Sequence, residues 1–260
     1  MSGILALEPN QTINISNDPK SVIEIVNLKK SFGSQEVIKN VSLKLFNGEN
    51  LVVLGKSGTG KSVLIKCIVG LLNFDSGNIS VFGKDVSKLS LAELNKLRED
   101  IGFLFQSGAL YDSMTVKQNL EFPLRRIKRN LSEKEISIKV ETVLESVGLL
   151  DALHKRPSQL SGGMKKRISL ARTIIVDPKI ILYDEPTTGL DPETAFEIST
   201  LINKVKDQYK TSSIIITHDI NCAKLTANRI LMIKDGEVYK EGLLKEFEQS
   251  TDESIHSFFR

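Results

Sequence analysis

The stretch that decides the fold reads Gly55-Lys56-Ser57-Gly58-Thr59-Gly60-Lys61-Ser62. It follows a compact apolar run at residues 51–54 and precedes a helical pattern over residues 61–72, so it joins a buried strand to a helix. Glycines let the backbone wrap closely enough for several N–H groups to face phosphate oxygens, and the start of a helix adds the positive end of its dipole. The pattern G-x-x-x-x-G-K-[ST] in this setting predicts a loop that binds a nucleoside triphosphate.

Within this loop the two last residues have separate expected roles. Lys61 is placed to reach the β and γ phosphates, and the Ser62 hydroxyl is placed to ligate Mg²⁺. The backbone of the preceding residues forms the expected phosphate cradle, namely Gly55, Ser57, Gly58, Thr59 and Gly60. The expected ligands are therefore ATP and Mg²⁺.

A second motif ends a later strand. Residues 180–185 read Ile-Ile-Leu-Tyr-Asp-Glu, an apolar strand that closes with two carboxylates. Side chains alternate along a strand, so the two acids can take separate roles. We expect Asp184 to hold Mg²⁺, directly or through water, and Glu185 to orient and deprotonate the water that attacks the γ-phosphate.

The remaining pattern predicts an α/β protein with one inserted part. Short apolar or alternating runs predict strands at 22–28, 41–46, 79–82, 179–183 and 213–217. Helical patterns cover 87–99 and 192–208, and a Ser132–Glu135 capping box begins another helix. Asp235-Gly236 predicts a hairpin between 230–234 and 237–239.

These elements predict a phosphate-loop NTPase (RecA-like) core of mostly parallel strands with an N-terminal antiparallel β part. We expect a flexible extension at 1–20, one ATPase domain at 21–240 with a helical subdomain inserted at about 87–160, and a short tail at 241–260.

The class of ATPase follows from Leu160-Ser161-Gly162-Gly163-Met164, which opens a helical pattern ahead of Asp184. Here the sequence resembles the ABC ATPase family, whose LSGGQ motif this is, with Met at the fifth position. The resemblance implies that Ser161, Gly162 and Gly163 contact the γ-phosphate held by a second copy of the chain. It therefore implies a head-to-tail homodimer that encloses two ATP molecules.

The resemblance extends from about residue 22 to residue 239 and assigns four further positions. It implies that Phe32 stacks on adenine and that Gln106 is the loop glutamine that meets Mg²⁺ and the attacking water. It also implies that Asp191 belongs to the loop that crosses the dimer interface, and that His218 is the switch histidine that contacts the γ-phosphate.

Composition and charge do not indicate a nucleic-acid-binding protein. The net charge is +3 over 260 residues, and no Lys/Arg run is long enough to track a phosphate backbone. No stretch approaches the roughly 18 apolar residues that span a bilayer. If the protein acts at a membrane, we expect another chain to supply the membrane part.

Several readings of the transported cargo remain open. Residues 103–125, with Gln106-Ser107-Gly108-Ala109-Leu110-Tyr111, resemble the Mla/Mkl group of lipid-transport ATPases, which act with a permease and MCE-domain proteins. The expected location is then the cytoplasmic face of the inner membrane, bound through the permease. The alternatives are the ATPase of a small-solute importer of the amino-acid type and a non-transport ATPase that regulates a membrane complex.

Overall fold

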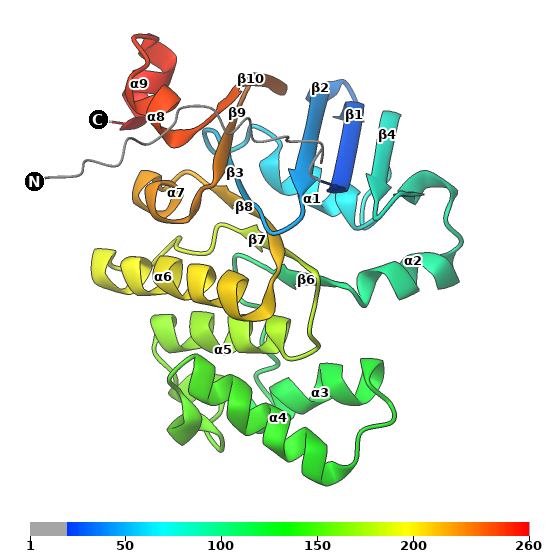
Figure 1. Ribbon diagram of the computed structural model, residues 1–260, viewed down its shortest axis with the longest axis vertical. Helices are drawn as coiled ribbons and strands as arrows, with labels where there is room; N and C mark the ends of the chain where they lie inside the picture. The colour runs from blue at the N-terminus through cyan, green and yellow to red at the C-terminus, as the bar shows by residue number, and fades with distance from the viewer. Residues whose placement is uncertain (1–19, 260) are drawn as a thin grey trace, which may run out of the picture.

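A computed structural model describes residues 20–259 and shows one continuous sheet with helices on both faces (Figure 1). The strands are β1 (Ser21–Phe32), β2 (Gln35–Phe46), β3 (Asn50–Leu54), β4 (Ser76–Val81), β5 (Lys84–Asp85), β6 (Ile101–Leu104), β7 (Ile180–Asp184), β8 (Ser212–Thr217), β9 (Arg229–Lys234) and β10 (Glu237–Gly242). Their order in the sheet is β5-β4-β1-β2-β10-β9-β3-β8-β7-β6. The expected extension at 1–20 lies outside the described residues except for Lys20.

The longer helices connect and cover these strands. They are α1 (Lys61–Ile68), α2 (Leu91–Arg98), α3 (Val116–Ile127), α4 (Glu133–Ser146), α5 (Gly162–Ile174) and α6 (Pro192–Tyr209). Shorter elements are α7 (Ile220–Thr226), α8 (Leu244–Glu248), α9 (Glu253–Phe259) and the 3₁₀ turns η1 (Val86–Lys88), η2 (Leu150–Ala152) and η3 (Pro157–Gln159).

One half of the sheet is parallel and buried on both faces. The strands β9, β3, β8, β7 and β6 run parallel to one another. Along β3, Leu51 and Val53 pack into the cluster that contains α1, whereas Val52 and Leu54 pack into the cluster that contains α5, α6 and α7. A strand covered on both faces is apolar at every position, which explains the short continuous runs in the sequence.

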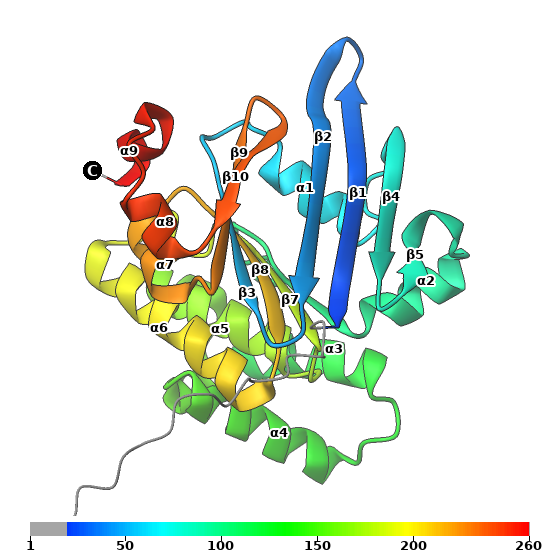
Figure 2. The same ribbon diagram turned by 45° about the horizontal axis from the view of Figure 1, so that its top comes forward.

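The other half is antiparallel, as expected for the N-terminal part. β1 pairs with β2 and with β4, and β5 pairs with β4, all antiparallel. The β9–β10 hairpin turns through Asp235 and Gly236, whose φ angles are 53° and 83°. Figure 2 shows β1, β2 and β4 side by side beyond α1. The predicted fold class is confirmed.

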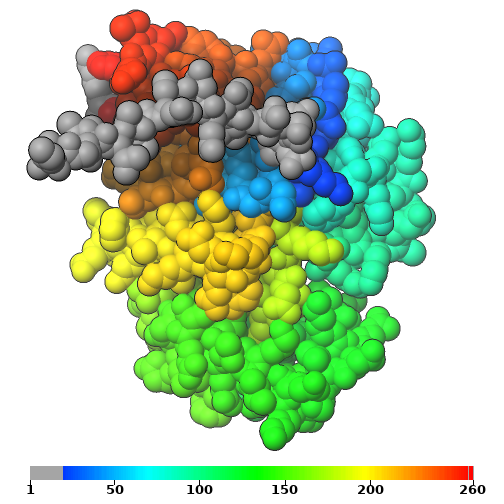
Figure 3. Space-filling view, viewed as in Figure 1, coloured from blue at the N-terminus to red at the C-terminus, as the bar shows by residue number. Residues whose placement is uncertain are grey.

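The helical subdomain forms a separate lobe at one end of the molecule, green in Figure 3. Ser132 starts α4 with the expected capping box, in which its hydroxyl accepts from the Glu135 N–H and the Glu135 carboxylate accepts from the Ser132 N–H. Ile136, Val140 and Val143 are buried on the inner face of α4, as the helical spacing predicts.

Three boundaries differ from the sequence expectation. α1 ends at Ile68 and not near 72, because Gly70 adopts a left-handed φ of 64° and its N–H bonds to the Cys67 carbonyl. The helix expected over 87–99 is divided, because Ser90 caps a new helix, α2. The segment 87–160 also contains β6, which pairs with β7 in the main sheet, so the helical lobe begins only at α3.

The last residues pack onto the ATPase body. β10 continues to Gly242, beyond the boundary expected at 240. Phe247 of α8 and Ile255 of α9 are 1% and 2% exposed and join the core cluster beside α7. Among residues 20–259, no helix combines the length and the apolarity that crossing a membrane requires.

Candidate active site

Four neighbouring parallel strands bring the predicted motifs to one edge of the sheet. Leu54 of β3 lies opposite Thr217 of β8, and Asp184 of β7 lies opposite Ile216 of the same strand. Leu104 of β6 lies opposite Tyr183. The carboxyl ends of β3, β8, β7 and β6 are therefore level, and the loops that follow them meet in the crevice where ligands bind in open α/β sheets.

The phosphate loop has the backbone that its glycines predict. Gly58 and Gly60 have φ angles of 82° and 89°. A Cβ atom on Gly60 would lie 2.8 Å from the Val37 carbonyl oxygen, so a larger residue at position 60 would clash with the backbone of Val37. Gly60 is followed at once by α1, so the first N–H groups of that helix face the crevice.

The Lys61 side chain lies against its own loop. Its Nζ donates to the carbonyl oxygens of Gly55 at 2.7 Å and Lys56 at 2.9 Å, and it is 3.9 Å from Glu185 Oε1. Burial lowers the pKa of Lys61, and the nearby carboxylates of Glu185 and Asp184 oppose that shift. The ammonium is thus held in a desolvated position where an anionic ligand would gain most from it.

Ser62 and Asp184 form the pair expected to hold Mg²⁺. The Ser62 hydroxyl donates to Asp184 Oδ1 at 2.8 Å, and the Asp184 side chain is almost fully buried. Burial raises the pKa of Asp184, whereas the bond from Ser62 lowers it. No cluster of three or more His, Cys, Asp or Glu residues suited to a metal occurs in the described chain. A hydroxyl and one carboxylate fit Mg²⁺, which keeps waters and phosphate oxygens as its other ligands.

Glu185 is turned away from Asp184 by its backbone. Its φ is 51°, a left-handed conformation that costs energy for a residue with a side chain. Its Oε2 accepts from the Thr188 hydroxyl at 3.0 Å and lies 2.9 Å from His218 Nδ1. The two acids that are adjacent in sequence therefore contact different partners, as expected for separate roles.

A cavity of about 350 Å³ lies between these groups. Its lining includes the predicted residues Ser57, Gly58, Gly60, Lys61, Ser62, Gln106, Glu185 and His218. The fold thus brings together side chains from four separate segments of the chain, namely Lys61 and Ser62, Gln106, Glu185, and His218. A cavity with a phosphate cradle, a lysine and a positioned carboxylate is suited to phosphoryl transfer to water.

Other predicted residues are not part of this lining. Ser161 caps α5, with its hydroxyl accepting from the Met164 N–H at 3.2 Å, and the Asp191 carboxylate caps α6 by accepting from the Thr194 N–H at 3.0 Å. Phe32 ends β1 and is 47% exposed, and the Lys30 ammonium lies 5.1 Å from the centroid of its ring. Gly163 is sterically required, because a Cβ atom there would lie 2.6 Å from Thr194 Cγ2.

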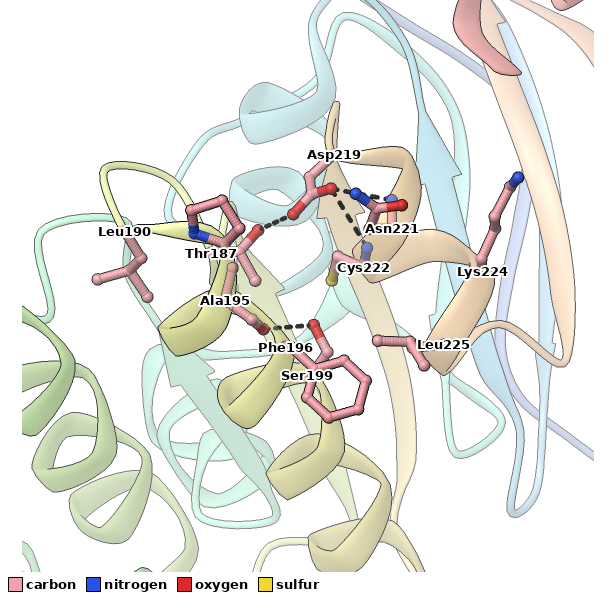
Figure 4. A pocket seen from close by; sticks show the side chains of 11 residues that line it. Thr187, Leu190, Ala195, Phe196, Ser199, Asp219, Asn221, Cys222, Lys224 and Leu225 are labelled. Atoms are coloured by element: carbon pink, nitrogen blue, oxygen red, sulfur yellow. Dashed lines mark hydrogen bonds between the residues drawn. The ribbon is translucent and has the colours of Figure 1, made fainter. Parts of the chain in front are cut away.

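The structure adds residues that sequence reasoning missed. Val37 and Thr188 line the cavity, and Thr188 could have been found from its hydroxyl three residues after Glu185. A second cavity of about 480 Å³ lies between α6 and α7, with Thr187 and Asp219 on its wall. In Figure 4 the Thr187 hydroxyl donates to Asp219, which also caps α7, so the loop after Glu185 is tied to the residue after His218.

Comparison with known proteins agrees with this site. The family model described as ABC transporter matches residues 38–188. The chain belongs to the ABC transporter ATP-binding family. The ATPase prediction is thereby confirmed, since ABC transporter cassettes bind and hydrolyse ATP.

Relatives within the ABC family differ in the cargo that their names state. The methionine import ATP-binding protein MetN of Campylobacter jejuni is 39% identical over 240 residues, which cover 86% of this chain and 71% of MetN. Protein TRIGALACTOSYLDIACYLGLYCEROL 3, chloroplastic, of Arabidopsis thaliana is 38% identical over 261 residues, covering 94% of this chain and 75% of that protein. The probable ribonucleotide transport ATP-binding protein mkl of Mycobacterium leprae is 42% identical over 211 residues, covering 81% of this chain and 60% of mkl.

Solved ABC cassettes share the fold over most of the chain. CbiO1 from Clostridium perfringens, part of the ABC transporter complex CbiONQ, superposes with a TM-score of 0.81 at 31% identity, covering 88% of this chain and 91% of CbiO1. The cassette MJ0796, solved as a dimer in a post-hydrolysis state with ADP and Pi, gives a TM-score of 0.78 at 34% identity, covering 85% of this chain and 98% of that cassette.

Proposed function

We propose that this ABC ATPase energises a separate membrane permease that moves lipid. In this proposal the chain acts as a head-to-tail homodimer, binds the permease at the cytoplasmic face of the inner membrane, and works with an MCE-domain partner. The proposal starts from the family membership and the ATPase activity, and it adds the cargo and the partners.

The proposed roles in hydrolysis follow from the contacts. Glu185 takes the proton of the attacking water, because His218 and Thr188 fix its carboxylate beside the phosphate cradle. Lys61 binds the β and γ phosphates when it exchanges its two carbonyl partners for phosphate oxygens. Ser62, Asp184 and Gln106 would hold Mg²⁺, which supplies charge neutralisation on the transferring phosphate.

The dimer is supported by the place of the Ser161 motif. Ser161 and Gly162 are exposed at the start of α5 and do not line the cavity of their own chain. A helix N-terminus that is open to solvent can bind the phosphate of another protomer. The cassette MJ0796, which was solved as a dimer, supports a dimer for this chain.

The permease contact is proposed at the loop after Gln106. Gly108 and Ala109 have φ angles of 78° and 51°, and Tyr111 is 41% exposed. The ring packs edge-on against Phe122 with the centroids 5.2 Å apart and lies beneath the Arg172 guanidinium at 4.8 Å. Tyr111 is thus both packed against the helical lobe and open on its outer side, where a helix from the permease can contact it.

The observation that carries the lipid proposal is the sequence of this loop, which resembles lipid-transport ATPases. The Arabidopsis relative, whose name contains a galactolipid, matches 94% of the chain. The alternative cargo is an amino acid, which is favoured by MetN relatives at 39% identity. The ribonucleotide in the name of mkl is a third cargo among the relatives.

Purification of the intact complex from its native membrane tests this proposal. We expect a permease and an MCE-domain protein to co-purify, phospholipid to be found by mass spectrometry, and ATP hydrolysis in vesicles to respond to phospholipid. Co-purification of a solute-binding protein, with hydrolysis stimulated by methionine and unaffected by phospholipid, would overturn the lipid proposal in favour of an amino-acid importer.

A further inference from the structure

Lys166 is a buried cation whose ammonium group donates to two main-chain carbonyl oxygens. It lies on α5, five residues after Ser161, and is 7% exposed. Its Nζ donates to the Gln106 carbonyl oxygen at 2.5 Å and, at a longer 3.4 Å, to the Glu185 carbonyl oxygen. One ammonium group therefore joins α5, the end of β7 and the loop that follows β6. This loop begins with Gln106 and is called the glutamine loop below.

This position is costly for a lysine. Burial lowers the pKa of Lys166, and the carboxylates of Asp184 and Glu185 oppose that shift from nearby. Removing an ammonium from water without a direct carboxylate partner disfavours folding, and an apolar side chain of the same length would avoid that cost. The lysine is thus poorly explained as a contribution to stability.

The same helix holds the glutamine loop at two further points. The Arg172 guanidinium donates to the Ala109 carbonyl oxygen at 2.5 Å, and a Cβ atom on Gly108 would lie 2.6 Å from Ser169 Oγ. Arg172 and Ser169 contact the loop alone, whereas Lys166 contacts the loop and the Glu185 backbone. Lys166 is therefore a point at which a displacement of the loop can reach Glu185.

The Glu185 backbone has a conformation that such a contact can control. Its φ of 51° is strained, its N–H donates to the Ile216 carbonyl oxygen at 2.9 Å, and its own carbonyl accepts from Lys166. Rotation of this peptide would move the carboxylate relative to Thr188 and His218. A small displacement of a catalytic group is sufficient to slow a reaction by about 10²-fold.

We propose that Lys166 is a positioning residue that couples the glutamine loop to the Glu185 carboxylate across α5. This coupling rests on the proposed roles of Glu185 and Gln106. It adds a route by which the glutamine loop, where the permease contact is proposed, controls the rate of ATP hydrolysis. Lys166 acts through the two backbone carbonyls and does not contact ATP.

The first experiment replaces the ammonium and measures steady-state ATP hydrolysis by the full chain. For Lys166→Met we expect kcat to fall about 10- to 100-fold with KM for ATP within about threefold, since the phosphate cradle is untouched. Lys166→Gln is made in parallel so that one folded variant is available, and Lys166→Arg, which keeps donors, should recover most of kcat. Lys204→Met, at an exposed position on α6, is the matched control.

Thermal unfolding separates positioning from stability. Because Met avoids the cost of a buried charge, we expect Lys166→Met to unfold at or above the wild-type temperature while its kcat is lower. A fall in kcat that tracks a fall in unfolding temperature in both the Met and the Gln variants would overturn the proposal. So would wild-type kcat in either variant that folds.

A double-mutant cycle with Glu185→Gln identifies the target of Lys166. If Lys166 acts through Glu185, Lys166→Met should lower kcat by less than about twofold in the Glu185→Gln background. A full additive loss there would show that it acts elsewhere. Wild-type hydrolysis by Glu185→Gln alone would instead defeat the proposed role of Glu185, so the two failures are distinguishable.

Discussion

At the scale of single residues, we propose that Glu185 decides whether bound ATP is hydrolysed. Its carboxylate is held by Thr188 and His218 beside the phosphate loop. We predict that Glu185→Gln keeps ATP affinity, lowers kcat by about 10²–10⁴-fold and accumulates an ATP-bound dimer, because the amide cannot take a proton from water. Calorimetric titration, steady-state hydrolysis and size-exclusion chromatography measure these outcomes. Glu145→Gln on the exposed face of α4 is the control, and equal turnover in the two variants would contradict the assignment.

Asp184 gives a prediction with a pH dependence. Its pKa is raised in the folded chain because burial disfavours the carboxylate. A raised carboxyl pKa means that the folded state binds more protons than the unfolded state over the intervening pH range, so stability falls as pH rises through that range. The destabilisation is fully present once the pH is above the folded-state pKa.

We therefore predict that Asp184→Asn raises the unfolding temperature of the nucleotide-free chain at neutral pH and abolishes Mg²⁺-dependent hydrolysis. The stabilisation should shrink as the pH is lowered toward the ordinary range of an aspartate. Differential scanning calorimetry over a pH series checks this result. A gain in stability that is the same at every pH, or an intact Mg²⁺ response, would contradict it.

Residues that line the cavity could be predicted from the sequence where the segment that positions them is local. Lys61 and Ser62 were found because the loop and helix that position them are contiguous in sequence. Lys166 and Thr188 were missed because their role depends on where distant segments meet. Lys166 donates to the carbonyl oxygen of Gln106, 60 positions away in the chain. Nothing in the sequence of α5 indicates that this lysine is buried near Asp184 and Glu185.

At the scale of elements, a serine cap sets the start of α4. The Ser132 hydroxyl accepts from the Glu135 N–H, and the Glu135 carboxylate accepts from the Ser132 N–H. We predict that Ser132→Ala destabilises the chain by about 1 kcal/mol and leaves kcat of the isolated ATPase near wild type, because the cap lies on the helical lobe. Ser132→Asp, which retains a capping acceptor, should be close to wild type. Urea unfolding measures the difference, and equal losses for Ala and Asp would reject the cap as the cause.

Elements were predictable to the extent that their ends carry a local signal. The Ser132 box was found because its side chains bond within three residues, and the Asp235-Gly236 turn because this residue pair favours the left-handed φ angles that a tight hairpin turn requires. The division at Ser90 was missed although it also has a capping box with Glu93, because the apolar positions on both sides continue at helical spacing. The inclusion of β6 in the main sheet could not be predicted, since its pairing with β7 depends on the whole intervening lobe.

At the scale of the whole molecule, the residues proposed to form one catalytic site lie in two different places on the chain. The phosphate cradle, Glu185 and His218 share one cavity, whereas Ser161 lies at the exposed start of α5 and caps only its own helix. In a twofold dimer, Ser161 of each copy can lie over the cavity of the other copy. The same two surfaces then pair twice, so the dimer is closed and leaves neither surface unpaired.

Two inactive variants should therefore restore activity when they are mixed. Lys61→Ala should fail because its own cradle binds ATP poorly, and Ser161→Glu because its carboxylate repels the γ-phosphate held by its partner. In a mixed dimer, the cradle of the Ser161→Glu chain meets the intact Ser161 of the Lys61→Ala chain, which completes one site. Random pairing makes half of the dimers mixed with one complete site each, so we predict about a quarter of wild-type turnover if the sites act independently.

Steady-state hydrolysis of the equal mixture, with each variant alone at the same total concentration, measures this recovery. Both variants should first show wild-type unfolding temperatures, so that a loss of folding is not mistaken for a loss of chemistry. Adding Glu185→Gln to the Ser161→Glu chain is the control, because it removes the base from the one complete site and should return the mixture to the background rate. Adding it instead to the Lys61→Ala chain should leave the recovered rate unchanged, since that cradle is already inactive. A mixture no more active than its parts would mean that each chain completes its own site, and the exposed start of α5 would then need another explanation.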